Sequence, residues 1–131
     1  MTEYLSTDDV IDIYIYAIRA TGDEPQGLRD RGLLESAVMR PQFVAHYQGA
    51  DLFEQAAVLA HGISRSQSFV DGNKRAALQA VSVFLRMNGY RLPPDRLAFA
   101  RILLAVTAPE ISSEDGEAAL ATWLREHTAP A

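Results

Sequence analysis

The stretch Phe69-Val70-Asp71-Gly72-Asn73-Lys74-Arg75 joins a polar loop to a long apolar run. Beyond it, apolar residues cover nearly every face of a helix that is predicted to begin at Gly72 or Asn73 and to end near Met87. A helix that is apolar all round is buried inside a bundle. Asn88-Gly89 ends it, because glycine accepts the left-handed conformation at a helix C-terminus. The stretch therefore predicts a central buried helix that starts from a polar loop.

The start of that helix combines residues that suit an anion. Asp71 stands where a side chain can cap the helix, and Gly72 lets the backbone turn and another molecule approach closely. The amides of Gly72, Asn73 and Lys74 then point out of the helix N-terminus, which attracts anions. Lys74 and Arg75 oppose the helix dipole in this position, so their presence indicates a bound phosphate chain. The alternative is that Asp71 only caps the helix and that both cations are only solvated.

Helical spacing of apolar residues recurs along most of the chain. Ser6 and Asp9 predict a capping box at the first helix. Because the residue before a proline avoids the helical region, a second helix should end before Pro41, and residues 41–51 are expected to form a short hairpin or flap. The remaining helices are predicted at about 52–64, at 95–107 and from Ser112 or Ser113 onward, with a frayed tail at 127–131. The sum is an all-α fold of about six helices, in a single domain over residues 1–131.

Composition narrows the classes of function. The formal net charge is −5, with 48% hydrophobic and 22% charged residues, which is an ordinary globular balance. An acidic chain is a poor match for non-specific binding to nucleic acid, although a small basic site on an acidic body stays open. The chain contains no cysteine, which excludes disulfides and thiolate metal sites. Neither a signal peptide nor a membrane-spanning run is visible, so we expect a cytoplasmic protein without a membrane partner.

The pattern Phe-x-Asp-Gly-Asn-Lys-Arg at residues 69–75 resembles the core of the motif of the Fic and Doc proteins. Residues 29–37, with Arg40 and Pro41, resemble the Doc segment before the flap, and residues 84–90 resemble the end of the family's central helix. Lys74 stands where most Fic proteins have a second glycine, and Leu78 where they have a second arginine. Both choices are typical of the Doc, or death-on-curing, branch of toxins. The resemblance therefore implies a Fic/Doc-like helical bundle.

The resemblance also implies ligands and partners. Fic proteins orient ATP to transfer AMP to a protein hydroxyl, whereas Doc-type proteins are thought to hold the nucleotide reversed and to transfer its γ-phosphate. Asp71 would ligate Mg²⁺, which prefers carboxylate and phosphate oxygens. Gly72, Asn73, Lys74 and Arg75 would bind the phosphates. Substrates of the Doc branch belong to the translation machinery, the usual partner is a small antitoxin, and direct binding to nucleic acid is not expected.

Gln67 occupies the position of the motif histidine, and Ser68 replaces the usual proline. The resemblance implies Asp71 and Arg75 as the other two catalytic positions. The histidine acts as general base, whereas a glutamine amide cannot accept the proton but can orient a hydroxyl. His61 and His46 are better explained as core or surface residues than as substitutes. Three explanations stay open: a pseudoenzyme that binds nucleotide or an antitoxin peptide, a weak enzyme, and a histidine replaced so that a toxic protein can be expressed. The paired change at Ser68 favours a natural departure.

Overall fold

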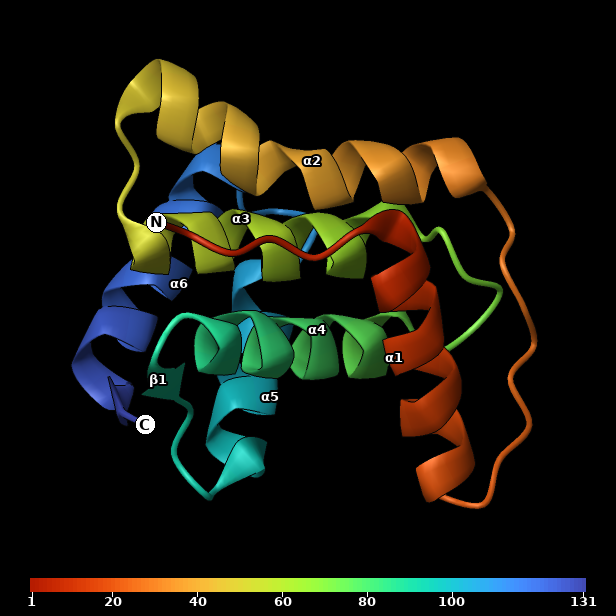
Figure 1. Ribbon diagram of the computed structural model, residues 1–131. Coiled ribbons are helices and arrows are strands. Elements are labelled where there is room, and N and C mark those ends of the chain that lie inside the picture. Colours follow the sequence, from red (N-terminus) through yellow and green to blue (C-terminus); the bar gives the residue numbers. More distant parts are fainter.

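The computed structural model describes residues 1–131 as a bundle of six helices with one very short sheet (Figure 1). The all-α class predicted from the sequence is therefore confirmed. In chain order the elements are α1 (Thr7–Ala20), α2 (Arg31–Gln48), α3 (Leu52–Ser66), α4 (Asn73–Met87), β1 (Tyr90–Arg91), α5 (Arg96–Val106), α6 (Ser113–His127) and β2 (Ala129–Pro130). None of these helices has the combination of length and apolar character that a bilayer crossing requires.

The centre of the bundle is shared by α3 and α4, which run side by side in Figure 1. α3 also packs against α2 and α6, and α4 against α1. Small side chains line the contact of the two central helices, which lets their backbones approach closely. These alanines are fully buried: Ala56, Ala57, Ala60, Ala76, Ala77 and Ala80. The predicted burial of α4 is confirmed, since Phe84 and Leu85 on its other side are at most 1% exposed.

The predicted flap at residues 41–51 is wrong. α2 continues through Pro41 to Gln48 and ends at Gly49, which has a left-handed φ of 65°. An interior proline removes one helical hydrogen bond and costs about 3 kcal/mol. Pro41 and Val44 are nonetheless buried on the face that α2 turns toward α3, in line with Leu34. Burial of this face offsets the lost hydrogen bond, so tertiary packing outweighs the local signal of the proline.

The β structure lies instead beside the C-terminal end of α4. β1 pairs antiparallel with β2, in the register Tyr90 with Pro130 and Arg91 with Ala129. The tail is therefore ordered rather than frayed, and the Ala131 amide donates to the Gly89 carbonyl at 2.9 Å. The N-terminal segment reaches the same end of α4, because the Asn88 side chain bonds both the N–H and the carbonyl of Glu3.

Helix ends were the most predictable local features. The capping box of Ser6 and Asp9 forms as expected, with both of its hydrogen bonds present. Ser112 caps α6, and Gly89 adopts a φ of 89° after α4. These features depend only on residues within one turn of each other, which is why sequence alone suffices to find them.

Candidate phosphate-binding site

The loop between α3 and α4 is held against an extended segment that precedes α2. Val70 N–H donates to the Gly27 carbonyl at 3.0 Å, and the amides of Arg29 and Asp30 both donate to the Ser68 carbonyl. Phe69, 1% exposed, anchors the loop by stacking on Tyr14 with ring centroids 3.8 Å apart. The chain that lies beside the motif is thus residues 27–30, and not the residues 41–51 for which a flap was predicted.

The start of α4 presents the three unbonded amides that the sequence predicted, at Gly72, Asn73 and Lys74, and a fourth at Arg75. The backbone N–H groups of Gly72, Asn73, Lys74 and Arg75 donate no hydrogen bond within the chain. The Asn73 side chain is used for another purpose, since its amide both accepts from Phe69 N–H and donates to the Phe69 carbonyl, each at 3.0 Å. Asn73 therefore shapes the loop, and the part of it that faces a ligand is its backbone amide.

Asp71 is not the cap of α4, contrary to the first expectation. The N-cap is Gly72, with φ 81° and ψ 21°, and no side chain caps the helix. A Cβ at Gly72 would lie 2.6 Å from Ile18 Cδ1, so the position requires glycine for space as well as for backbone angle. Asp71 is exposed and makes no hydrogen bond or ion pair within the chain. Its carboxylate is consequently available to a ligand.

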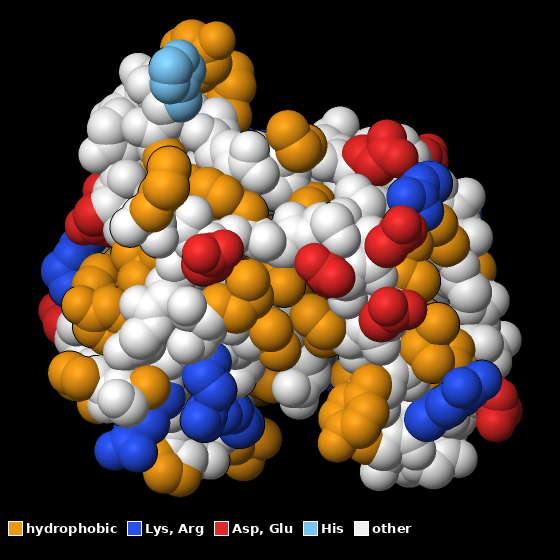
Figure 2. Space-filling model, viewed as in Figure 1, with side chains coloured by type: hydrophobic (Ala, Val, Ile, Leu, Met, Phe, Trp, Pro, Cys, Tyr) orange, Lys and Arg blue, Asp and Glu red, His pale blue; other side chains and the backbone are white.

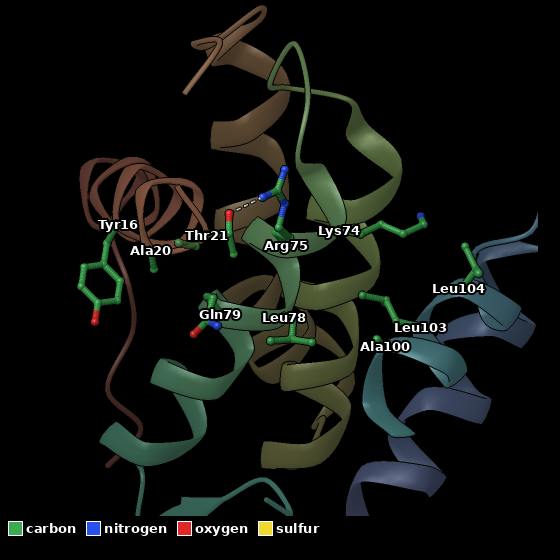
Figure 3. Close-up of a pocket in the computed structure, with 11 residues that line it drawn as sticks. Tyr16, Ala20, Thr21, Lys74, Arg75, Leu78, Gln79, Ala100, Leu103 and Leu104 are labelled. Atoms are coloured by element: carbon green, nitrogen blue, oxygen red, sulfur yellow. Dashed lines mark hydrogen bonds between the residues drawn. The ribbon is translucent and has the colours of Figure 1, made fainter. Parts of the chain in front are cut away.

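Arg75 extends from α4 toward the end of α1, as Figure 3 shows. Its guanidinium donates to Thr21 Oγ1 at 2.9 Å and to Asp23 Oδ2 at 3.0 Å. Asp71 and Arg75 line one pocket of about 240 Å³, together with Tyr14, Ile18, Asp23, Glu24 and Gln26. The structure thus brings together the predicted Asp71 and Arg75, and it adds Asp23, which no local sequence signal identified.

The Lys74 side chain is hydrogen-bonded within the chain. Its ammonium donates to Ser64 Oγ at 2.7 Å and to Thr107 Oγ1 at 3.2 Å, on the side of α4 away from Arg75 (Figure 3). Burial lowers the pKa of Lys74, and the nearby Arg65 guanidinium lowers it further. Consecutive residues of a helix point about 100° apart, so the side chains of Lys74 and Arg75 leave α4 in different directions, although both line the groove between α1, α4 and α5. In this arrangement only the backbone amide of Lys74 faces the ligand side of the loop.

Gln67 ends α3 with a left-handed backbone, φ 55°, and it is the one non-glycine residue with a positive φ. The Arg29 guanidinium holds its carbonyl with two hydrogen bonds, of 2.8 Å and 2.5 Å. The Gln67 side chain is exposed and makes no hydrogen bond. Ser68 is fully buried with its Oγ 2.6 Å from Ser66 Oγ, a contact that the usual proline could not make. Arg29 belongs to the segment that resembles Doc proteins, but only the structure shows that it positions Gln67.

His61 and His46 are engaged elsewhere, as expected. His61 is 2% exposed, and its Nδ1 lies 3.9 Å from Glu117 on α6. Burial lowers the pKa of His61, and the Glu117 carboxylate opposes that shift only partly. His46 packs edge-on against Tyr47 near the end of α2. Neither ring contacts the loop, so both serve packing.

Comparison with known proteins agrees with this geometry. The model of the Fic/DOC family matches residues 4–85, which include α1, α3, the loop and most of α4. The chain belongs to the Fic/DOC family. It is similar to the protein named Toxin Doc of Mycolicibacterium smegmatis, with 41% identity over 99 residues, or 72% of each chain. It is also similar to the protein named Protein kinase doc of Escherichia phage P1, with 34% identity over 90 residues, or 68% of this chain and 71% of the phage protein.

The residues of this Fic/DOC loop fit a nucleotide better than a free metal ion. No three acidic or histidine side chains converge as a metal site. Mg²⁺ is commonly held by one or two carboxylates together with the phosphates of a nucleotide, and the unbonded Asp71 suits that arrangement. The four unbonded amides and the Arg75 guanidinium are donors for phosphate oxygens. Asp71 would then hold the ion, while the start of α4 would hold the phosphates.

Proposed function

We propose that the chain is a Doc-type toxin that transfers a phosphoryl group from ATP to a hydroxyl of a protein, with residues 69–75 as its phosphate-binding loop. The observation that carries this proposal is the group of four unbonded amides at the start of α4 beside the Arg75 guanidinium. Phosphoryl transfer depends mainly on positioning and charge stabilisation, which such donors supply. The names of the two relatives, a toxin and a protein kinase, favour phosphate over AMP as the transferred group.

Each residue of the site has a part in this proposal. Asp71 would hold the Mg²⁺ that accompanies ATP and neutralises phosphate charge. Arg75 would bind phosphate oxygens after exchanging its exposed partner Asp23, whose side chain is 61% exposed, for the ligand. The acceptor hydroxyl, in a protein of the translation machinery, would approach Gln67, whose unbonded amide can orient it. Such a toxin would act in the cytoplasm, where ATP and this acceptor are found.

A second candidate function is nucleotide binding without transfer. It is favoured by one observation, namely that no histidine lies at the loop in place of the motif histidine. Three carboxylates line the neighbouring pocket: Asp23 is paired with Arg75, Asp71 is assigned to the metal ion, and Glu24 is an exposed carboxylate, whereas the motif base is an imidazole, whose ordinary pKa lies near neutrality. Loss of a general base costs about 10²- to 10⁴-fold in rate. A slow enzyme and a pseudoenzyme therefore share the same binding site and differ in turnover.

Growth arrest separates these functions. The chain, Gln67→His and Arg75→Ala would each be expressed from an inducible promoter, with equal protein levels verified. Arrest by the unaltered chain that Arg75→Ala abolishes supports a working toxin. Arrest only after Gln67→His supports a site that binds nucleotide without useful transfer. If Gln67→His gives no arrest, and ATP with Mg²⁺ shifts no amide of residues 70–76 in NMR spectra of either protein, the proposed phosphate-binding loop is wrong.

We further propose that a small antitoxin segment covers the groove between α1, α4 and α5. This groove, of about 420 Å³, opens below α4 in Figure 2 with apolar side chains on its floor. Tyr16 and Leu104 on its walls are 74% and 60% exposed. Arg75 lines both this groove and the pocket beside Asp71, so a segment bound here would touch the phosphate-binding arginine.

The double substitution Tyr16→Asp and Leu104→Asp tests the groove. It should abolish rescue of growth by the antitoxin encoded beside the toxin gene, because charges replace the apolar walls. Met39→Asp with Phe43→Asp is the matched control, since both residues are similarly exposed on α2, at 55% and 54%. Equal rescue of both double variants would contradict the groove as the antitoxin site and would leave the phosphate-binding loop unaffected.

A further inference from the structure

The C-terminal end of α4 carries a second group of cations, far from the loop. Arg86 lies in the last turn of α4, Arg91 in β1, and Arg96 is the first residue of α5. All three line one pocket of about 540 Å³, together with Leu92, Pro93, Pro94, His127 and Ala129. Fifteen helical residues separate the two ends of α4, which corresponds to about 22 Å. The pocket therefore cannot be part of the phosphate-binding loop.

These three arginines have no acidic partner, although the chain as a whole has a net charge of −5. The side chains of Arg86 and Arg91 make no hydrogen bond, and no Asp or Glu lines the pocket. Arg96 donates to the Pro93 carbonyl at 2.6 Å, and the adjacent Asp95 is used to cap α5. In Figure 2 the corresponding region, over β1 and the start of α5, shows blue side chains with no red among them. Its positive charge is therefore not neutralised within the chain.

Local helix chemistry explains only part of this group. Arg86 is favourable where it stands, because a cation complements the C-terminal end of α4. Arg96 has the opposite position, at the N-terminus of α5, where a cation opposes the helix dipole. Arg91 lies on the short sheet, whose pairing with residues 129–130 fixes the backbone of this wall. Two of the three cations thus gain nothing from their own element, and the backbone that carries them is held in place.

The geometry points to a binding pocket for the phosphate groups of a nucleotide, either as a free nucleotide or as part of an RNA chain. One guanidinium group can donate two parallel hydrogen bonds to a phosphate. Three guanidinium groups therefore suit a ligand that carries several negative charges. The volume is that of a site for a small ligand. Leu92 and two prolines add an apolar wall against which a base can lie. His127 adds a ring held by its 4.2 Å stacking on Trp123.

Residue-resolved NMR of the full chain can test this pocket separately from the loop. ATP without Mg²⁺, a ten-nucleotide oligouridylate and citrate would be the three probes. The amides of residues 86–92, 95–97 and 127–129 report the pocket, whereas those of residues 70–76 report the loop. Arg86→Gln with Arg91→Gln should weaken ATP binding at the pocket roughly tenfold, because two charge-assisted contacts are lost. Arg19→Gln with Arg101→Gln is the matched control, since it removes the same charge from two other exposed arginines that make no side-chain hydrogen bond.

Each outcome supports or overturns the assignment. Shifts at residues 86–97 with ATP, weakened only by the pocket variant, support it. Much tighter binding of the oligouridylate at the same amides identifies RNA as the source of the phosphates, and similar affinity identifies the free nucleotide. Equal weakening by both double variants would show unspecific attraction and overturn it. Citrate that binds as tightly as ATP would overturn the choice of phosphate, and absent shifts at residues 86–97 would overturn the pocket itself.

Discussion

Cationic side chains lie at both ends of α4, but their contacts within the chain differ. At the N-terminal end, Arg75 is paired with Asp23, and Lys74 donates to two hydroxyl groups. At the C-terminal end, Arg86 and Arg91 have no partner within the chain. An anion that binds at the N-terminal end must therefore displace contacts, whereas an anion at the C-terminal end displaces only water. The amides at the start of α4 compensate for this difference, because they offer directed donors that the other end lacks.

This contrast shows that a cation near a helix end does not by itself identify a ligand site. Lys74 stands in the motif, but its ammonium belongs to the interface of α3 and α5. Arg75 stands beside it and faces the pocket. What distinguishes them is the direction in which each side chain leaves the helix, and that direction has meaning only relative to the neighbouring helices.

Gln67→His should produce the largest change at the N-terminal end. A histidine restores the general base, so the rate of phosphoryl transfer should rise about 10²- to 10⁴-fold. The fold should tolerate it, because histidine accepts the left-handed backbone of this position more readily than most residues. Transfer of labelled γ-phosphate to protein in a ribosome-containing extract measures the rate. Gln67→Asn is the control, since it keeps an amide and also accepts this backbone. Equal rates for the two variants would contradict the role of Gln67 as the position of the base.

Arg75→Ala should weaken binding of ATP with Mg²⁺ at the loop by roughly 10- to 100-fold. This corresponds to the loss of hydrogen bonds from a charged donor, about 1.5–3 kcal/mol. A titration followed by the NMR shifts of the amides of residues 70–76 measures the affinity at the loop alone, and Arg86→Ala at the other end of α4 is the control. The comparison of the two ends would fail if both substitutions weakened loop binding equally.

Asp23→Asn should act in the opposite direction and tighten binding at the loop about two- to fivefold, because the ligand no longer competes with an exposed ion pair. Asp8→Asn, which breaks the exposed pair with Arg31, controls for the change in net charge. The same titration serves for both variants. Weaker binding after Asp23→Asn would mean that Asp23 contacts the ligand or its metal ion directly, and not that it restrains Arg75.

Lys74→Met should give the smallest effect on ATP affinity, less than about twofold, since its ammonium faces Ser64 and Thr107. A loss of tenfold or more would support the phosphate-binding role of the Lys74 ammonium that the sequence predicts. The same variant has a signature in stability. The pKa of Lys74 is lowered from 10.5, so the unfolded chain binds this proton more tightly. The free energy of unfolding should therefore rise as pH increases through the interval below 10.5. In urea unfolding of Lys74→Met, this part of the pH dependence should be absent.

Predictions from sequence succeeded where the deciding contacts are local. The caps at Ser6 and Ser112, the left-handed Gly89 and the free amides at the start of α4 all depend on neighbouring residues. Pro41 shows the limit of the same reasoning, because burial of the face of α2 against α3 offset the missing hydrogen bond. The composition gives the net charge of the chain, but a sum over 131 residues cannot show that three arginines line one pocket.

The sequence by itself determined the class of the fold, the central helix and the loop with its glycine, since periodicity, capping and the motif are written in adjacent residues. Only the tertiary structure decided what the charged side chains of the loop do. Asp23 and Arg75 are 52 residues apart, and Arg29 and Gln67 are 38 apart. Such contacts follow from the packing of α1 against α4 and of the segment before α2 against the loop between α3 and α4. The partner of each charged side chain depends on which residues lie near it in the folded chain, and a local sequence pattern does not contain that information.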